Sequence, residues 1–214
     1  MMENSQPPYV PEPAIRRLPW YLACVQQLRS QGVEHVSSTA ISQQLNVDAS
    51  QIAKDLSYLN IKGKTRIGYE VAELEKGLND FLGFRRSHRA VMMGVGSLGR
   101  ALVTDSGLSR YGLNIVAGFD VDPAVIGTNI AGVPIYDVAE LNTRRQQLGA
   151  EIAVIAVPVE SAAHVTELCI GAGIKALWNF TPFHIKSRAG IVIENTSIYA
   201  HLAVMYNRMA TQQK

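Results

Sequence analysis

The 214-residue sequence contains little cysteine, no marked excess of either charge and no long apolar run. Its two cysteines, Cys24 and Cys169, lie far apart within apolar helical patterns, which indicates buried thiols and not a disulfide framework or redox pair. The formal net charge is only +2, so the charge of the whole chain does not indicate a nucleic-acid-binding protein. No run approaches the roughly 18–20 apolar residues of a membrane helix, and the Pro-rich N-terminus has no signal-peptide pattern. We therefore expect a cytoplasmic protein that does not bind membranes.

The short patterns that mark many catalytic and metal sites are also missing. The sequence has no G-x-S-x-G nucleophile elbow and no cysteine–histidine signature. Its five histidines show no metal-ligand spacing; they are His35, His88, His164, His184 and His201. We expect neither a catalytic residue nor a metal ligand, although a catalytic pair can also assemble from residues that are distant in sequence.

The chain divides into segments with different apolar patterns. Residues 1–14 are polar and Pro-rich and are expected to form a disordered lead-in. Helical spacing of apolar residues dominates residues 15–85, whereas strand-length apolar runs alternate with helices over 86–196. A last apolar helix is expected over 197–214. This order predicts a helical domain followed by an α/β domain with a parallel sheet.

Four segments of the helical domain have apolar residues at helical spacing: residues 15–30, 38–45, 48–59 and 71–82. Ser38 is expected to cap the second helix and Asp48 the third, with Gln51 as the partner of Asp48 in a capping box. The residues expected to face inward from the fourth helix are Leu74, Leu78 and Phe81. Gly63 and Gly68 bracket two basic residues, Lys64 and Arg66, between the third and fourth helices, which predicts a small β-hairpin.

Three short helices and a basic hairpin resemble a winged helix-turn-helix, which binds DNA. The segment from Ser50 to Ile67 holds four basic residues and one acidic residue. In this geometry the second helix of the motif enters the major groove, and the wing contacts phosphates or a minor groove. The residues expected to contact DNA are Ser38, Ser50, Gln51, Lys54, Tyr58, Lys64 and Arg66. The alternative is a solvated polar face on a small helical domain.

The alternating part begins with the apolar run "AVMMGVG", followed by a helix to about Ser106 and a second strand, "NIVAGFDVD". Further strands are expected at Ile135 and over residues 151–159, 174–180 and 190–195, with a helix over 161–173. The order of these elements favours a Rossmann-like domain, in which parallel strands alternate with helices.

A glycine-rich loop joins the first strand of this domain to its first helix. The spacing G-x-G-x-x-G permits a tight turn, close approach of the backbone to a pyrophosphate, and close packing of helix and strand. The N–H groups at the start of the helix then face the phosphates. The loop residues expected to bind a dinucleotide are Gly94, Val95, Gly96, Ser97, Leu98 and Gly99. The alternative is a glycine-rich turn that binds no ligand.

Asp120 ends the second strand, where a carboxylate accepts hydrogen bonds from an adenosine ribose and repels a 2′-phosphate. It therefore favours NAD over NADP. Val157 and Pro158 follow a later strand and are secondary candidates, because ligands bind outside the carboxyl ends of parallel strands. The two domains use almost the whole chain and leave no segment for a substrate domain. We therefore expect a sensor of the nucleotide, not an enzyme.

The last segment, "SIYAHLAVMYNRMA", is a helix with apolar residues around much of its circumference. One stripe consists of Ile198, Leu202, Met205 and Met209, and it is extended by Tyr199, Ala203 and Tyr206. A helix of this kind must bury its apolar faces. We expect it to pack either on its own domain or against a partner subunit.

The sequence resembles the Rex redox-sensing transcriptional repressors of bacteria from about Ile15 to Met209. The stretches that carry the resemblance are "RLPWYL", "GVEHVSS", "QIAKDLSYL", "GKTRIGYEV", "GVGSLGRAL", "GFDVDP", "AVPVESA" and "GIKALWNFTP". The resemblance implies a homodimer with N-terminal winged helices, Rossmann-like NAD(H)-binding domains and a C-terminal helix swapped between subunits. It also implies binding to an inverted-repeat operator in double-stranded DNA, release by NADH and competition by NAD⁺. Transcription would then follow the NADH/NAD⁺ ratio.

Three positions depart together from the pattern of some family members. Those members have a tyrosine in place of Asp105, an aspartate in place of Ser197 and an arginine in place of Ala23, and the three are thought to form a switch near the nicotinamide. That switch cannot be carried over to this sequence. We expect Asp105 and the partner subunit's Ser197 to meet near the nicotinamide. The alternative is that Asp105 is a solvated carboxylate at a helix end.

Two other functions compete with this interpretation. One is a regulator whose related nucleotide fold holds another ligand, such as coenzyme A. Asp120 argues against that ligand, because it is placed for an unmodified ribose. The other is a small NAD-dependent oxidoreductase with a helical N-terminal appendage, and the lack of room for a substrate domain argues against it.

Overall fold

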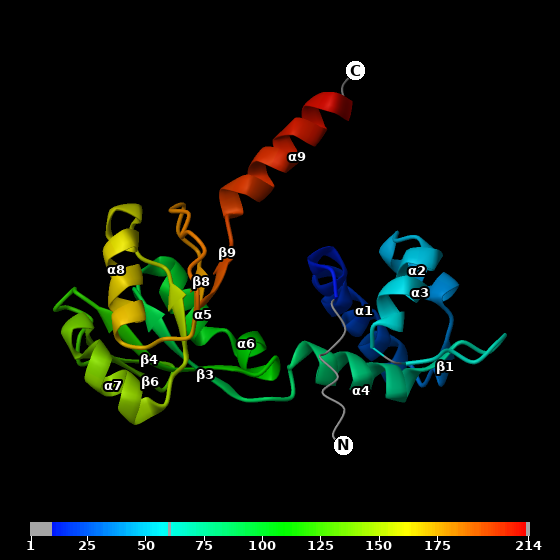
Figure 1. The fold of residues 1–214 in the computed structure, drawn as a ribbon, viewed down its shortest axis with the longest axis horizontal. Coiled ribbons are helices and arrows are strands. Elements are labelled where there is room, and N and C mark those ends of the chain that lie inside the picture. Colours follow the sequence, from blue (N-terminus) through cyan, green and yellow to red (C-terminus); the bar gives the residue numbers. More distant parts are fainter. Residues whose placement is uncertain (1–9, 60, 213–214) are drawn as a thin grey trace. The chain divides into compact units, whose positions relative to one another are not determined.

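The computed structural model describes residues 10–59 and 61–212, and the chain forms two compact units, Met1–Arg85 and Arg86–Lys214 (Figure 1). Most of the predicted lead-in, residues 1–14, lies outside the described residues. Its last part is helical, because helix α1 (Glu12–Ser30) already begins at Glu12. The prediction of disorder as far as residue 14 is wrong there. Pro13 suits the first turn, where its missing N–H is not needed, and Ala14 is buried.

The described part of the first unit is a small helical domain with a two-stranded antiparallel ribbon. Its elements are α1, β1 (His35–Val36), α2 (Ser38–Leu45), α3 (Ala49–Ser57), β2 (Tyr69–Glu70) and α4 (Val71–Leu82). All four helices contribute to one apolar core, which includes Leu18, Leu22, Ile41, Ile52, Leu56, Leu74 and Leu78. Phe81, predicted to face inward, is instead 38% exposed, and Leu82 and Phe84 pack against the core from that end of α4.

Two capping predictions in this unit differ from the structure. Ser37, and not Ser38, caps α2, and its side chain accepts a hydrogen bond from a backbone N–H at 3.1 Å. Adjacent serines offer the same capping chemistry, so the backbone conformation decides between them. Asp48 caps α3 as predicted. The Gln51 amide, however, donates forward to Asp55 at 2.8 Å, so its side chain does not complete a capping box.

The basic segment after α3 forms a tight reversal that serves as the wing. The N–H of Lys64 donates to the carbonyl oxygen of Gly68 at 2.7 Å, and the N–H of Gly68 donates back at 2.9 Å. Gly68 has a φ of +92°, and a Cβ there would lie 2.4 Å from the carbonyl oxygen of Val36. Only glycine therefore fits where the wing returns to β1.

The second unit is built on a seven-stranded sheet of order β5-β6-β4-β3-β7-β8-β9. The strands are β3 (His88–Met93), β4 (Leu113–Asp120), β5 (Asn129–Ile130), β6 (Val133–Asp137), β7 (Ile152–Ile155), β8 (Ala176–Asn179) and β9 (Val192–Asn195). All neighbouring strands are parallel except β5 and β6. Without β5, the order is the 3-2-1-4-5-6 arrangement of the Rossmann fold. The predicted α/β architecture is therefore confirmed.

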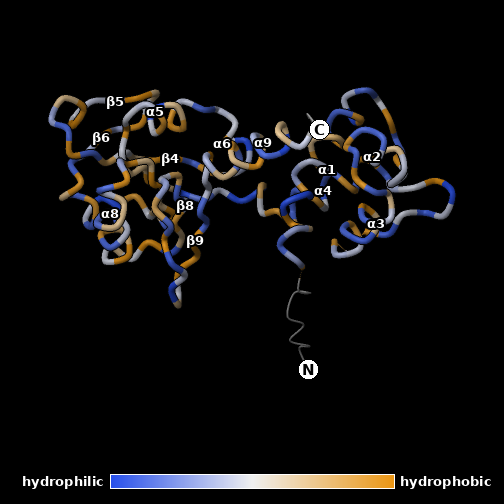
Figure 2. Tube along the Cα trace, turned by 90° about the horizontal axis from the view of Figure 1, so that it is seen from above, coloured by the Kyte–Doolittle hydropathy of each residue, from blue (hydrophilic) through white to orange (hydrophobic). Residues whose placement is uncertain are grey.

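Both faces of this sheet are apolar, as expected for buried parallel strands, and the hydrophobic stretches of the chain follow the strands (Figure 2). The helices of the unit are α5 (Ser97–Thr104), α6 (Ser106–Arg110), α7 (Leu141–Leu148), α8 (Val159–Gly171) and α9 (Ile198–Gln212). The single helix predicted to reach Ser106 is broken, because Asp105 adopts an extended conformation and caps α6. The sequence did not predict α7, in which only Leu141 is buried.

A buried carboxylate ties α1 to α3 within the first unit. Asp55 is 1% exposed, and its oxygens accept from Arg17 Nε at 2.7 Å, Arg17 Nη2 at 2.9 Å, the Tyr21 hydroxyl at 2.8 Å and Gln51 Nε2 at 2.8 Å. Burial by itself would raise the pKa of Asp55, but the hydrogen bonds outweigh it and hold the pKa below its usual range. Burial and the bond to Asp55 raise the pKa of Tyr21 to about 12, so its hydroxyl stays a donor.

We predict that Asp55→Asn destabilises the first unit by about 2–4 kcal/mol at pH 7, because it leaves the Arg17 guanidinium without its charge partner. Urea unfolding followed by Trp20 fluorescence, in a Trp178→Phe background, measures this change. The contribution of Asp55 is complete above the unfolded pKa of about 3.9 and disappears as the pH falls through the lower folded pKa. The difference between the two proteins should therefore shrink below about pH 4.

Glu12→Gln is the control for this prediction, because it removes an exposed ion pair with Arg16 on the same helix. Exposed pairs of this kind contribute little, so we expect a change of less than about 0.5 kcal/mol. Equal stabilities for the Asp55→Asn variant and the unmodified protein at pH 7 would contradict the assigned role of Asp55.

Candidate functional site

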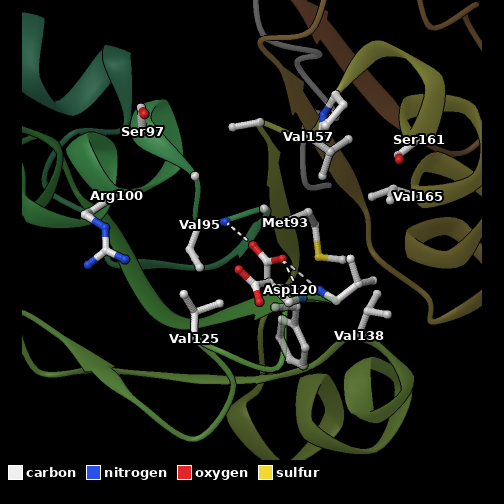
Figure 3. Close-up of a pocket in the computed structure, with 17 residues that line it drawn as sticks. Met93, Val95, Ser97, Arg100, Asp120, Val125, Val138, Val157, Ser161 and Val165 are labelled. Carbon is white, nitrogen blue, oxygen red and sulfur yellow. Dashed lines mark hydrogen bonds between the residues drawn. The ribbon is translucent and has the colours of Figure 1, made fainter.

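A cavity of about 560 Å³ lies at the carboxyl ends of β3, β4 and β7, beside the start of α5 (Figure 3). The sheet order changes direction between β3 and β7, and doubly wound sheets bind ligands at this point. Most lining side chains are apolar. The charged ones are Arg100, Asp120 and Asp122. The cavity thus combines apolar walls with a few polar groups, as small-molecule sites commonly do.

The glycines of the loop have separate structural roles. Gly94 has a φ of +86°, and a Cβ there would lie 2.9 Å from the carbonyl oxygen of Ala156 on the neighbouring strand connection. A Cβ at Gly99 would lie only 1.9 Å from the carbonyl oxygen of Gly94. Gly96 has nothing within 4 Å of its Cβ position and lines the cavity. Gly94 and Gly99 are therefore required by the fold, whereas Gly96 leaves space for a ligand.

Asp120 holds the glycine loop from the end of β4. Its Oδ2 accepts a hydrogen bond from the N–H of Val95 at 2.7 Å, and its Oδ1 accepts from the N–H groups of Val121 at 2.8 Å and Asp122 at 3.1 Å (Figure 3). These backbone donors fix the orientation of the carboxylate beside the cavity. A carboxylate oxygen can accept more than one hydrogen bond, so Oδ2 retains capacity for a ligand hydroxyl.

The structure brings most of the predicted nucleotide-binding residues to this cavity. Those that line it are Gly94, Val95, Gly96, Ser97, Asp120, Val157 and Pro158. Leu98 and Gly99 belong to α5 but do not line it. The sequence analysis missed the other lining residues, which are Met93, Arg100, Phe119, Val121, Asp122, Val125, Val138, Ala156, Ser161 and Val165. Arg100 could have been found from its spacing, because it lies in the first turn of the helix that Gly96 precedes as N-cap. Val125 reaches the cavity from a turn and Val138 from a short 3-10 helix, Val138–Glu140, and neither segment carries such a pattern.

Only some of the residues predicted to contact DNA have side chains that are exposed and not bound to other protein groups. Ser50 and Lys54 are exposed on α3, and Tyr58 follows it half-buried. Gln51 is half-buried, with its amide bound to Asp55, and Ser38 is a half-buried residue in the first turn of α2. Ser50 and Lys54 are therefore better placed than Gln51 to contact a base or phosphate.

Arg66 occupies an unusual backbone conformation in the wing. Its φ is +67°, in the left-handed region, and its side chain is exposed. For a residue with a Cβ this conformation costs roughly 1–2 kcal/mol, and glycine adopts it freely. Glycine would therefore be more stable than arginine at position 66, so stability does not explain why an arginine is found there. An exposed cation at the tip of a wing is suited to contact phosphates or a minor groove.

Two family models match the chain in the same order as the two units. A model described as "Putative DNA-binding protein N-terminus" matches residues 9–57, and a model described as "CoA binding domain" matches residues 85–183.

Curated relatives match nearly the whole chain. The redox-sensing transcriptional repressor Rex of Bacteroides fragilis is 56% identical over 94% of this chain and 91% of the relative. The repressor of the same name from Porphyromonas gingivalis is 54% identical over 94% and 92% of the two chains. The chain belongs to the Rex family of redox-sensing transcriptional repressors.

Solved Rex structures have the same fold. RSP in complex with β-NAD⁺ and operator DNA matches with a TM-score of 0.90 and 29% identity, over 96% of this chain and 94% of RSP. RSP in complex with β-NADH matches with a TM-score of 0.85 and 30% identity, over 95% and 96% of the two chains. The resemblance seen in the sequence is therefore confirmed for the family and for the fold.

Two of the three positions at which the sequence departs from the pattern of some family members have local structural roles. Asp105 is the N-cap of α6 and accepts a hydrogen bond from the N–H of Leu108 at 3.0 Å. The hydroxyl of Ser197 accepts from the N–H of Ala200 at 3.1 Å at the start of α9. Neither residue lines the cavity formed by one chain. Their predicted meeting near a nicotinamide would need the partner subunit and stays a prediction.

We predict that alanine substitutions at two glycines of the Rex glycine loop change stability to different extents. Gly99→Ala should destabilise the second unit by about 1–3 kcal/mol, because its methyl group meets the Gly94 carbonyl oxygen and forces the helix away. Gly96→Ala should change stability by less than about 0.5 kcal/mol, because its methyl group enters open space. Urea unfolding followed by Trp178 fluorescence, in a Trp20→Phe background, measures both. Similar losses in the two variants would contradict the separate roles.

Proposed function

We propose that this protein is a homodimeric repressor that binds an operator through its first units and leaves the DNA when NADH occupies the cavity of the second unit. The observation that carries this proposal is the cavity at the sheet reversal, with Asp120 at its edge, in a chain of the Rex family. Support comes from RSP, which is described in complex with β-NAD⁺ and operator DNA and in complex with β-NADH. The role of the nucleotide is that of a signal and not of a reactant.

The carboxylate of Asp120 favours NAD(H) over ligands with a phosphorylated ribose. Three backbone N–H groups orient it, and its charge opposes a 2′-phosphate. Coenzyme A also carries a phosphate on its adenosine ribose, so the same repulsion acts against the ligand named in the matching domain model. We therefore take NADH and NAD⁺ as the ligands that this site senses.

Helix α9 is the element through which we propose that two subunits associate. Its exposed apolar side chains are Ile198, Tyr199, Val204, Met205, Tyr206 and Met209. Apolar surface of this kind marks sites of protein association. Exchange of α9 between two copies would bury these side chains, as the resemblance to the family implies. A two-fold symmetric dimer also matches the two half-sites of an inverted-repeat operator.

Release of DNA follows from a difference in affinity. NADH shifts the protein away from DNA only if it binds the form that cannot engage both half-sites more tightly than the form that can. NAD⁺ competes for the same cavity without this preference, so DNA occupancy follows the ratio of the two nucleotides. An operator in a bacterial cell places this activity in the cytoplasm. No helix in the described part of the chain is long and apolar enough to cross a membrane.

The two thiols are poorly suited to carry the redox response themselves. Cys24 and Cys169 are both buried, and burial raises the pKa of Cys24 and raises that of Cys169 to about 12. Only the thiolate reacts readily with oxidants, so neither cysteine is activated. The nucleotide is therefore the better carrier of the redox signal.

Asp105 and the partner subunit's Ser197 remain our candidates for residues near the nicotinamide. The structure gives Asp105 a capping role that is sufficient to explain it, which supports the alternative of a helix-end carboxylate. Asp105→Asn separates the two roles, because an asparagine also caps a helix. If NADH releases this variant from DNA at the same concentration as the unmodified protein, capping is the sole role of Asp105.

We predict that NADH, but not NADPH or coenzyme A, displaces the protein from an inverted-repeat operator, and that NAD⁺ raises the NADH concentration required. Gly96→Ala should bind the same DNA and resist release by NADH, because its methyl group occupies the space through which the loop backbone meets the pyrophosphate. Gel-shift titrations with the four nucleotides measure both effects. Release by coenzyme A alone would establish the alternative ligand, and turnover of NADH with a substrate would establish an enzyme.

We predict that Arg66→Gly separates DNA binding from stability. The substitution relieves the left-handed backbone, so the free energy of unfolding should stay unchanged or rise by about 0.5 kcal/mol. Operator affinity should fall roughly tenfold, because a cationic contact of the wing is lost. Asn46→Gly is the matched control, since Asn46 also has a positive φ of 52° but lies at the end of α2. Unchanged operator affinity in Arg66→Gly would exclude Arg66 from the interface.

A further inference from the structure

Arg100 is a charged residue of the cavity to which neither the glycine motif nor the family match assigns a role. It is the fourth residue of α5, and its exposed side chain lies beside the cavity on the same side as Ser97 (Figure 3). Of the described residues that line the cavity, it is the single cation. The other two charged residues are the carboxylates Asp120 and Asp122.

In the part of the chain that the structure describes, no protein group explains the position of this guanidinium. It has no hydrogen bond or ion pair within residues 10–59 and 61–212. The carboxylate of Asp120 is bound by three backbone N–H groups, and that of Asp122 accepts from the N–H of Ala124 at 2.9 Å. Both acidic side chains of the cavity are thus satisfied without Arg100. Its charge is left available to a ligand.

The helix itself also disfavours a cation at this position. The N-terminal turn of a helix carries a partial positive charge, which favours acidic residues and opposes basic ones. Helix α5 has no acidic residue in its first turn to offset Arg100. Arg100 therefore adds positive charge where the unpaired N–H groups of the helix already point. This arrangement is unfavourable in the empty protein and becomes favourable when an anion is bound.

We propose that Arg100 binds the pyrophosphate of the dinucleotide and sets the total NAD(H) concentration at which the cavity fills, without distinguishing NADH from NAD⁺. The inference rests on the proposed function. The pyrophosphate carries two negative charges and is common to both redox forms. The loop N–H groups supply donors but no net charge, while Asp120 and Asp122 add negative charge to the same cavity. A guanidinium offsets that repulsion and donates hydrogen bonds to phosphate oxygens.

The affinity that Arg100 provides decides whether DNA occupancy follows the NADH/NAD⁺ ratio or also the total NAD(H) concentration. When total NAD(H) exceeds both dissociation constants, the site is always full and its state depends only on the NADH/NAD⁺ ratio. If both affinities fall together, part of the protein becomes empty, and DNA occupancy also depends on the size of the pool. Arg100 therefore keeps the sensor responsive to the ratio and insensitive to the total concentration.

The test compares Arg100→Gln and Arg100→Lys with the unmodified full-length protein by titration calorimetry. We expect Arg100→Gln to raise the dissociation constants of NADH and NAD⁺ by the same factor, roughly tenfold, with their ratio unchanged. The affinity of this variant should also depend less on salt concentration. Arg100→Lys keeps the charge and should remain within about threefold of the unmodified protein. Arg110→Gln is the matched control, since Arg110 is an exposed arginine of the same unit that has no partner among the described residues and does not line the cavity.

Several outcomes would overturn the inference. An Arg100→Gln variant that binds both nucleotides as tightly as the unmodified protein excludes Arg100 from the site. A loss confined to one of the two redox forms would assign the guanidinium to the nicotinamide half. If the unmodified protein binds no NADH, the proposed function fails, and this inference fails with it. The thermal unfolding midpoint of each variant, compared with that of the unmodified protein, checks that the fold is unchanged.

Discussion

The close approach of α5 to the end of β3 is the constraint on which the nucleotide cavity depends. A side chain at Gly99 would lie 1.9 Å from the carbonyl oxygen of Gly94, so helix and loop meet through backbone atoms alone. Asp120 then holds the loop from the neighbouring strand through the N–H of Val95. These contacts aim the first N–H groups of α5 at the cavity and leave Gly96 open to a ligand. The charge of Arg100 acts on a ligand that this backbone arrangement has already oriented.

A carboxylate has a comparable role in the first unit. Asp55 projects from α3 into the core, where it holds Arg17 and Tyr21 of α1. The same carboxylate draws the Gln51 amide inward, while Ser50 and Lys54 remain exposed on α3. The bonds that fix the helix therefore also decide which of its polar residues are free to meet DNA. The buried Asp55 carboxylate therefore fixes α3 against α1 and removes the Gln51 amide from the exposed surface.

Sequence reasoning succeeded where a pattern was local and repeated. The glycine spacing, the acidic end of β4 and the alternation of strands and helices were sufficient to predict the Rossmann-like domain and seven of the residues that line its cavity. It failed where adjacent residues offer the same capping chemistry, or where a helix has no apolar pattern. Ser37 and Ser38 offer the same cap, Asp105 interrupts an otherwise helical stretch, and α7 buries only Leu141. The cavity residues Val125 and Val138 come from a turn and a short 3-10 helix, whose paths depend on contacts distant in sequence.

By itself, the sequence determined the family, the two-domain organisation and the chemistry of the nucleotide site, because these depend on residue types at short, fixed spacings. Only the tertiary structure decided how individual side chains are used. It showed that the Gln51 amide is bound to Asp55, that Asp105 caps α6 and that the Arg100 guanidinium stands unpaired among the described residues beside the cavity. The reason is physical: the partner of a polar group is set by which elements the fold places within hydrogen-bonding distance, and spacing along the chain does not specify that.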